Sequence, residues 1–309
     1  MSIYEHCETF AGRPVVEYQS DDKAPPEVDD PSTVAFRING EYETDADEFR
    51  ELLDILLDSA GAGRVQALII GEWGEAFERS APVDLLVEYA DRLVNLRALF
   101  VGEMTGEQCE ISWIKQTDVT PLLSAYPRLE TLRVRGADGL EFRPGSYGAL
   151  KELAFESGGL PAAVVRAVGE CDLPALEHLE LWLGVNEYGG DATVDDLAAI
   201  LGGTRLPRLR HLGLRDAEIA DQVAAAGAAA PVVARLAELD LSMGILSDVG
   251  AEALLAGQPL THLRRLNLAH HYLSPAMAER LVAELPGVDV DVSDEQEDDD
   301  GERYVAVAE

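Results

Sequence analysis

Large apolar residues recur along this chain with one spacing, in which an apolar residue is followed by two others, three and five positions later. Eight such triplets succeed one another, and they open at Val65, Leu96, Leu129, Leu150, Leu176, Leu209, Leu236 and Leu263. A shortened ninth closes the series at Val288, Val290 and Val292. Successive triplets open 21 to 33 residues apart, and their members alternate as in a short strand. We therefore predict one short strand in each repeat.

Helix signals lie between the triplets. In the unit from Leu263 to Leu281, Ser274 and Pro275 follow the strand and precede apolar residues spaced three and four apart. Comparable helix starts are Ala81 with Pro82, Asp118 with Pro121, Leu160 with Pro161, Thr193 with Asp196, and Ser247. Strands joined by helices run parallel, and a strand–helix unit buries its apolar face only against copies of itself. The fold class predicted is an α/β solenoid, with a curved parallel sheet on the concave face and helices on the convex face.

The two ends of the chain differ from the repeats. Residues 1–62 hold a possible short strand at 14–18, a strand at 33–38, and a helix that we expect Thr44 to cap, with Asp47 completing a capping box. This segment is predicted to cap the solenoid of residues 63–293, because an uncapped end would present an open strand edge. Residues 294–309 are strongly acidic with only a short apolar end, so a disordered tail is expected.

The repeat pattern resembles that of leucine-rich-repeat proteins, in particular the ribonuclease-inhibitor-like class. Several stretches resemble more closely an uncharacterised family of bacterial cytoplasmic leucine-rich-repeat proteins, among them ISWIKQTDVTPLL at 111–123, ELWLGVNEYGGDATV at 180–194 and LDLSMGILSDVGAEALL at 239–255. The resemblance implies the solenoid fold and a non-enzymatic role. One departure is clear: where common repeats place a turn-bridging Asn or Cys, this chain has Gly184, Ala217, Gly244 and His271.

Composition restricts the partners. The formal net charge is −34, from 58 acidic and 24 basic residues, so the surface repels nucleic acid and anionic lipid and favours a protein with a basic surface. The three cysteines, Cys7, Cys109 and Cys171, show no paired spacing, which is typical of reduced thiols. The first twenty residues lack signal-peptide features and no apolar run is long enough to span a membrane, so we expect a cytoplasmic protein.

Strand positions between the leucines face the concave side. They carry Arg133, Arg135, Glu156, His178, Glu180, Trp182 and Arg215 in the central repeats. Farther along, Glu238 is expected beside both His211 and Arg265. Two interpretations remain open: a docking surface for a protein, or a ladder of charges that satisfy one another in water. The face begins with apolar residues, Ile69 and Phe100, which either the N-terminal segment or a partner must cover.

All three tryptophans lie at or soon after the carboxyl end of a predicted strand. They are Trp73, Trp113 and Trp182, and Tyr188 lies in the loop after Trp182. Because the strands run the same way, these loops share one rim, where aromatic residues are typical anchors for a partner. We therefore add all four to the predicted protein-binding residues. The alternative is that each tryptophan covers the end of its own repeat.

Motifs for other chemistry are missing from the sequence. His270 and His271 are adjacent in an extended segment and point to opposite faces, so they do not form a metal site. There is no GxSxG elbow, no recognised Cys–His nucleophile motif and no phosphate-binding glycine loop. We predict no catalytic residue, metal or cofactor. The favoured function is a protein-binding scaffold; a regulatory subunit or inhibitor that wraps an enzyme is the alternative, an intrinsic enzyme comes third, and a broad concave face disfavours a small-molecule ligand.

Overall fold

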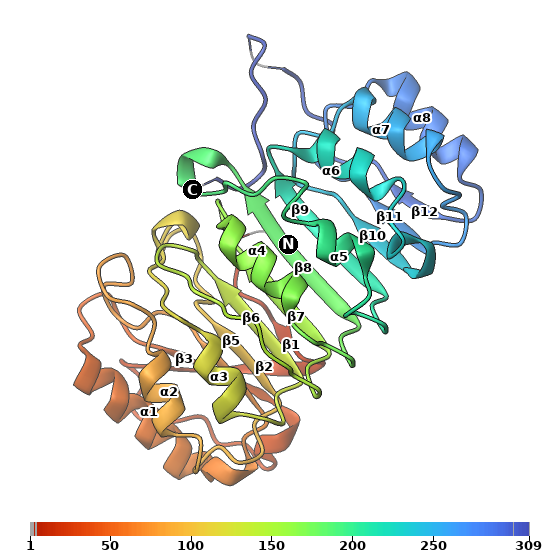
Figure 1. Cartoon of the computed structure of the whole chain (residues 1–309). Coiled ribbons are helices and arrows are strands. Elements are labelled where there is room, and N and C mark those ends of the chain that lie inside the picture. The colour runs from red at the N-terminus through yellow and green to blue at the C-terminus, as the bar shows by residue number, and fades with distance from the viewer. Residues whose placement is uncertain (1–2, 4, 299, 309) are drawn as a thin grey trace. The chain divides into compact units, whose positions relative to one another are not determined.

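The computed structural model describes residues 3, 5–298 and 300–308, and the chain divides into two compact units (Figure 1). Unit 1 comprises the residues up to 142 together with 149–152, and unit 2 comprises 143–148 and 153–308. No helix among the described residues has both the length and the apolar character needed to cross a membrane.

The strands of each unit follow one another in chain order. In unit 1 they are β1 (Thr9–Phe10), β2 (Arg13–Gln19), β3 (Ala35–Asn39), β4 (Ala67–Ile70), β5 (Ala98–Val101) and β6 (Thr131–Arg135). β7 (Glu152–Glu156) begins at the last residue of the unit 1 segment, and unit 2 continues with β8 (His178–Gly184), β9 (His211–Ala217), β10 (Glu238–Asp240), β11 (Arg265–Asn267) and β12 (Asp289–Asp291). β1 pairs antiparallel with β2, whereas β2 to β6 and β8 to β12 pair parallel.

The predicted triplets fall in register. In unit 1, Leu68, Leu99 and Leu132 are partners on adjacent strands. In unit 2 the aligned positions are Leu179, Leu212, Leu239, Leu266 and Val290. These leucines are buried, so each repeat contributes its apolar side to its neighbours. The prediction of one strand per repeat is confirmed for all nine triplets.

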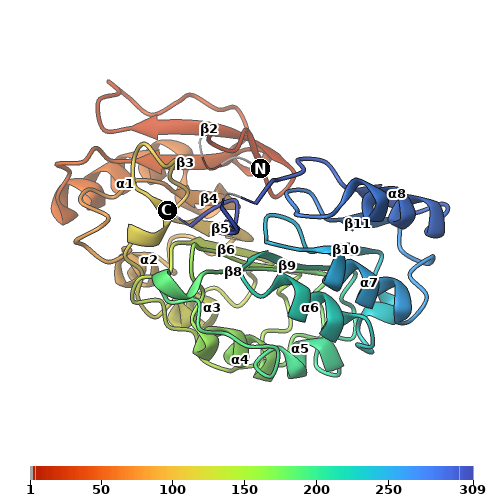
Figure 2. The same cartoon turned by 90° about the horizontal axis from the view of Figure 1, so that it is seen from above.

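Helices connect most of the strands. They are α1 (Ala46–Ala60), α2 (Val83–Glu88), α3 (Thr120–Ala125), α4 (Ala162–Glu170), α5 (Ala198–Gly202), α6 (Ala220–Gly227), α7 (Asp248–Ala256) and α8 (Pro275–Glu284). Short 3-10 helices occupy Pro31–Thr33, Ala62–Arg64, Ile111–Trp113, Asn186–Tyr188 and Val233–Arg235. Figure 2 shows α4 to α8 along one side of the strands of unit 2. In each unit, we call the side of the strands that carries the positions between the buried leucines the open face. The connection 136–151 contains no helix, so strand and helix do not alternate throughout.

Three helix starts differ from the sequence prediction. α5 begins at Ala198, after the N-cap Leu197, and not at the predicted start of Thr193 with Asp196. Asp45, not Thr44, caps α1: its side chain accepts from the backbone N–H groups of Asp47 and Glu48, and Glu48 accepts from Asp45 in return. The chain holds two overlapping capping patterns, and only the longer Glu48 side chain reaches back, so the prediction was wrong by one residue. α6 was not predicted, because its N-cap, Ile219, offers no side-chain acceptor.

Close backbone contact replaces the missing asparagine at the turns. Gly184 has a φ of +67°, and a Cβ there would lie 1.9 Å from the carbonyl oxygen of Gly158. The approach lets the N–H of Val185 bond to Gly158 (2.8 Å) and that of Leu160 bond to Leu183 (3.0 Å). Neighbouring turns are therefore joined main chain to main chain, which only glycine permits at this distance.

In the last repeat a histidine side chain, that of His271, joins one turn to the next. His271 is buried, its Nδ1 accepts from the N–H of Leu273 (3.1 Å), and its Nε2 lies 3.0 Å from the carbonyl oxygen of Val292. This pattern fits a neutral imidazole that donates through Nε2 and joins one turn to the next. His270 faces elsewhere, with Nδ1 3.3 Å from Asp294 and Nε2 3.1 Å from the carbonyl oxygen of Tyr304.

The N-terminal hairpin covers the apolar start of the open face in unit 1. Phe10, on β1, packs into a buried cluster with Ile69 and Phe100, and the centroids of the two phenylalanine rings are 5.8 Å apart. Cys7 and Val15 pack against the same cluster. The apolar residues are therefore covered by the chain's own first strands.

A buried carboxylate holds this hairpin in place. Glu103 accepts from Arg37 Nε (2.7 Å) and the N–H of Cys7 (2.8 Å), and its Oε2 lies 2.9 Å from His6 Nδ1. Burial by itself would raise the pKa of Glu103, but these partners hold that pKa below its usual value. Burial, together with Glu103, raises the pKa of the Cys7 thiol to about 11.

The end of the chain packs on unit 2, in contrast to the disordered tail expected from its charge. Val305 and Val307 are buried, the N–H of Val307 bonds to Asp216 Oδ1 (3.0 Å), and that of Ala306 bonds to the carbonyl oxygen of Met243 (2.8 Å). The short apolar segment after the acidic run therefore finds a place beside the ends of β9 and β10.

Replacing Asp216 by asparagine is expected to stabilise the protein at neutral to alkaline pH. Asp216 is fully buried, burial raises its pKa well above the usual value, and its Oδ2 has no hydrogen-bond partner among the described residues. The folded state holds this proton over a pH range in which the unfolded chain has lost it, so the stability of the wild type falls as pH rises through that range. The left-handed φ of 54° suits asparagine.

Urea unfolding of Asp216→Asn and wild type along a pH series tests this expectation. The advantage of the variant should grow with pH and shrink toward acid. A constant difference would contradict the argument.

Candidate functional site

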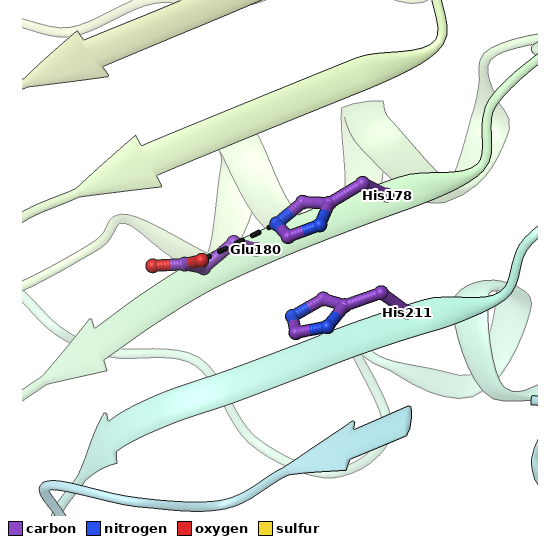
Figure 3. Close-up of side chains that lie close together, drawn as sticks. All are labelled: His178, Glu180 and His211. Atoms are coloured by element: carbon purple, nitrogen blue, oxygen red, sulfur yellow. Dashed lines mark hydrogen bonds and ion pairs between the residues drawn. The ribbon is translucent and has the colours of Figure 1, made fainter. Parts of the chain in front are cut away.

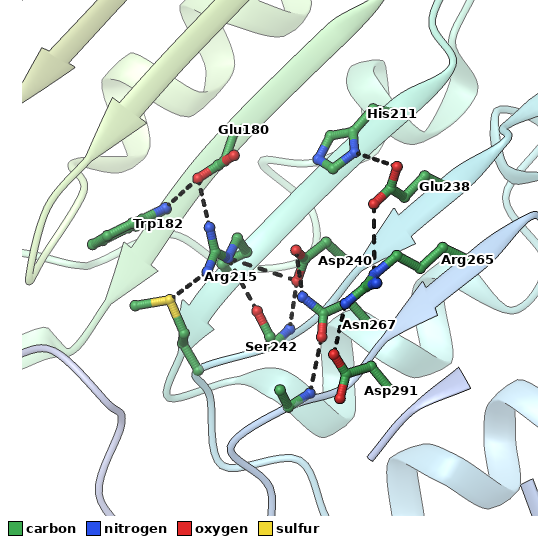
Figure 4. A network of polar contacts seen from close by, with 12 residues as sticks. Glu180, Trp182, His211, Arg215, Glu238, Asp240, Ser242, Arg265, Asn267 and Asp291 are labelled. Carbon is green, nitrogen blue, oxygen red and sulfur yellow. Dashed lines mark hydrogen bonds and ion pairs between the residues drawn. The ribbon is translucent and has the colours of Figure 1, made fainter. Parts of the chain in front are cut away.

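A polar network lies on the open face of unit 2 (Figure 4). It is contributed by β8 to β12 and by the residues that follow them, namely Glu180, Trp182, His211, Arg215, Glu238, Asp240, Ser242, Arg265, Asn267 and Asp291. These side chains project from the strand positions between the buried leucines. We call this set, together with His178 and Asp289, which pair with His211 and Arg265 on the neighbouring strands, the polar face.

Arg215 is the centre of the first half of the polar face. Its Nη1 lies 2.8 Å from Glu180 Oε1, its Nε donates to Ser242 Oγ (3.0 Å), and its guanidinium lies 5.2 Å from the centroid of the Trp182 ring. Burial alone would lower the pKa of Arg215, but Glu180 and Asp240 outweigh it and raise that pKa. The arginine is 12% exposed, so this half is largely satisfied within the protein.

Arg265 is the centre of the second half, which is more open. Its Nη1 lies 3.0 Å from Asp289, its Nη2 2.6 Å from Asp291, and its Nε 3.8 Å from Glu238. Glu238 lies also 3.5 Å from His211 Nδ1, so the predicted placement of Glu238 beside both His211 and Arg265 is confirmed. The side chains of Arg265 and Asp289 are 39% and 67% exposed, which leaves them accessible to a partner.

The predicted tryptophan anchors are placed differently from one another. Trp73 is buried and donates from Nε1 to the carbonyl oxygen of Arg79 (2.9 Å); Trp182 is buried within β8 and donates to Glu180 (2.7 Å). Trp113 is 55% exposed and Tyr188 is partly buried. Two of the three indoles therefore cover their own repeats, and the idea of exposed anchors at these positions is wrong for Trp73 and Trp182.

Four predicted protein-binding residues remain, namely His178, Arg133, Arg135 and Glu156. His178 lies on β8 beside Glu180. In unit 1, Arg133 bonds to Glu152 (2.6 Å), and Arg135 is buried, donating to the carbonyl oxygen of Met104 and lying 5.4 Å from the centroid of the Phe100 ring. Glu156, at the end of β7, is buried. The sequence pattern places Glu238 and Arg265 on the same face of the strands, but it does not single them out as binding residues. Whether a partner can reach a side chain depends on its exposure, which the apolar pattern does not reveal.

Strand–helix repeats in chain order, with leucines aligned on successive strands, define the class: this is a leucine-rich-repeat solenoid protein. Among solved structures it is similar to a Bacteroides fragilis protein determined by a structural genomics consortium, with 34% identity over 83% of this chain and 74% of that one and a TM-score of 0.76. The chain belongs to the same family as that protein. An internalin from Listeria monocytogenes also matches, at 13% identity over 86% of this chain and 82% of that one with a TM-score of 0.30, and adds nothing to the assignment. No protein-family model and no curated protein matches.

Proposed function

We propose that this protein is a non-enzymatic protein-binding scaffold, and that its docking surface is the polar face of unit 2. Solenoids of this class offer extended surfaces on their strands, where many side chains are presented on a rigid frame. The observation that supports unit 2 in particular is the contrast between the two units. The apolar start of the open face in unit 1 is covered by the N-terminal hairpin, whereas Arg265, Asp289 and Glu238 in unit 2 keep exposed charge.

The charge of the polar face favours a basic partner. The ion pairs of Arg265 involve three carboxylates, those of Glu238, Asp289 and Asp291, and the whole chain carries −34. A positively charged protein surface would be steered to such a face and would bind faster at low salt. We also propose a cytoplasmic location, which the three free cysteines support.

Reversing two charges on the polar face is expected to weaken binding strongly. The variant Glu238→Lys with Asp289→Lys changes one partly buried and one exposed carboxylate of the more open half. The control, Glu170→Lys with Glu279→Lys, makes the same change in net charge at exposed positions on α4 and α8, on the helical side. The affinity for partners captured with the wild type should fall at least about tenfold for the first variant, since interface charge reversals cost several kcal/mol.

Partner affinities are compared by titration at low and high salt. The control variant should bind as the wild type does. Equal loss in both variants would mean that only net charge matters, and unchanged binding by the polar-face variant would move the docking surface elsewhere.

A further inference from the structure

Two histidines and a glutamate converge on the polar face, at the start of β8 and β9 (Figure 3). The rings of His178 and His211 stack with centroids 3.8 Å apart and planes 3° from parallel. Glu180 extends from β8 toward the same point, and its Oε2 lies 3.3 Å from His178 Nε2. One ligand atom from each of the three residues lies within 4.8 Å of the others.

The Nε2 atom of His211 has no hydrogen-bond partner among the described residues, although it is buried. Its other nitrogen, Nδ1, lies 3.5 Å from Glu238 Oε2. A carboxylate on the side of Nδ1 favours the tautomer with its proton on Nδ1 and its lone pair on Nε2, and metal-binding histidines are commonly oriented in this way.

Two neighbouring side chains hold Glu180 through its Oε1 atom. Trp182 Nε1 (2.7 Å) and Arg215 Nη1 (2.8 Å) both donate to Oε1, while Oε2 faces His178. A ligating carboxylate needs this kind of support, because a fixed oxygen loses little freedom when an ion binds.

The strand position opposite Glu180 has no side chain. Gly213 pairs with Glu180 across β8 and β9, and a Cβ there would lie 3.2 Å from Glu180 Cγ and 3.5 Å from His211 Nε2. Glycine within a strand weakens it, and it often marks a place where a ligand approaches the backbone closely. A side chain at this position would press on Glu180 and on His211 Nε2.

We propose that His178, Glu180 and His211 form a binding site for a divalent transition-metal ion of the Zn²⁺ type. Imidazole nitrogen and carboxylate oxygen are donors that suit Zn²⁺ and Co²⁺, and three protein ligands leave a fourth position for water or for a group of a partner. Bond lengths of about 2.0–2.2 Å require the stacked rings to tilt apart and draw their Nε2 atoms toward a common point. The site lies on the polar face, yet it stands independently of the proposed docking function.

Binding is tested with Zn²⁺ by calorimetry and with Co²⁺ by visible absorption, on the full chain. Millimolar Mg²⁺ is kept present throughout, because it occupies the many exposed carboxylates without competing for imidazole. We expect one ion per chain, and a Co²⁺ spectrum with the intense bands of a four-coordinate site. The variants His178→Ala and His211→Ala should each weaken Zn²⁺ binding at least about tenfold.

The matched control is His6→Ala. His6 also pairs with a glutamate, and its side chain is 29% exposed, as is that of His178, but it lies in unit 1 outside the cluster. It should leave Zn²⁺ affinity unchanged, and circular dichroism verifies that each variant is folded. Absence of Zn²⁺ binding by the wild type, or equal affinity in the wild type and in folded His178→Ala and His211→Ala, would overturn the proposal.

Discussion

Replacing Glu103 by glutamine is expected to lower the free energy of unfolding by about 3–5 kcal/mol, the usual cost of leaving one partner of a buried ion pair alone. Glu103 is fully buried and accepts from both Arg37 and the N–H of Cys7. Glutamine keeps an acceptor for Cys7 but turns an amide toward the guanidinium of Arg37 and removes its counter-charge. The N-terminal hairpin should then detach from the cluster around Phe100. Urea unfolding measures the loss.

Glu88→Gln is the matched control, because it breaks an ion pair of similar length on the surface, between Glu88 and Arg50 (2.8 Å, with side chains 57% and 43% exposed). It should change stability little. A second readout follows the Cys7 thiol, whose pKa is raised by burial and by Glu103. Glu103→Gln should make Cys7 react faster with a thiol reagent, while Cys109 keeps its rate. A stability loss as small as that of the control would show that the hairpin does not depend on this carboxylate.

The same carboxylate sets an acid limit on the stability of unit 1. Since the pKa of Glu103 is lowered in the folded state, its contribution is present above the unfolded pKa and is lost as pH falls through the folded value. The difference in stability between wild type and Glu103→Gln should therefore narrow toward acid pH.

Replacing Gly184 by alanine is expected to destabilise the protein by about 2–5 kcal/mol. The left-handed backbone costs a residue with a Cβ about 1–2 kcal/mol, and overpacking costs about 1–3 kcal/mol more. At Gly184 the new Cβ would meet the backbone of Gly158 and Gly159, at 1.9 Å from a carbonyl oxygen and 2.4 Å from a nitrogen, so no side-chain rotation relieves the clash. The main-chain bonds between the two turns should break, and amide exchange at Val185 should accelerate.

Gly202→Ala serves as its control. Gly202 ends α5, and a Cβ there would meet no atom within 4 Å. Alanine in a helix should raise stability by about 0.5–1 kcal/mol. A Gly184→Ala variant as stable as the wild type would show that the close contact between Gly184 and Gly158 is not what joins the two turns.

Much of the fold follows from the sequence because it depends on spacing. In each triplet the apolar residues are all buried only if neighbouring strands pair in one register. Leu179, Leu212, Leu239 and Leu266 therefore align on successive strands. The same alternation placed Glu238 between His211 and Arg265. These are local rules, and each repeat applies them again.

The candidate sites depended on features that spacing does not encode. Trp73 and Trp182 have the positions of exposed anchors but are buried, because Arg79 and Glu180 accept their indole N–H groups. The acidic composition of the end of the chain suggested a free tail, yet Val305 and Val307 find a buried place beside Asp216 and Met243. The indole contacts are local but depend on how each strand end folds, whereas the tail contact joins residues far apart in the chain.

The sequence by itself determined that this protein is a leucine-rich-repeat solenoid. It also determined which strand positions point their side chains away from the core. Only the tertiary structure decided that the N-terminal hairpin covers the open face of unit 1, and that His178, Glu180 and His211 meet beside Gly213 on unit 2. The physical reason is that a periodic apolar stripe is buried in a way that depends on the spacing of residues close together in the chain. The partner of a charge or a ring depends instead on which groups the fold brings within about 3–4 Å.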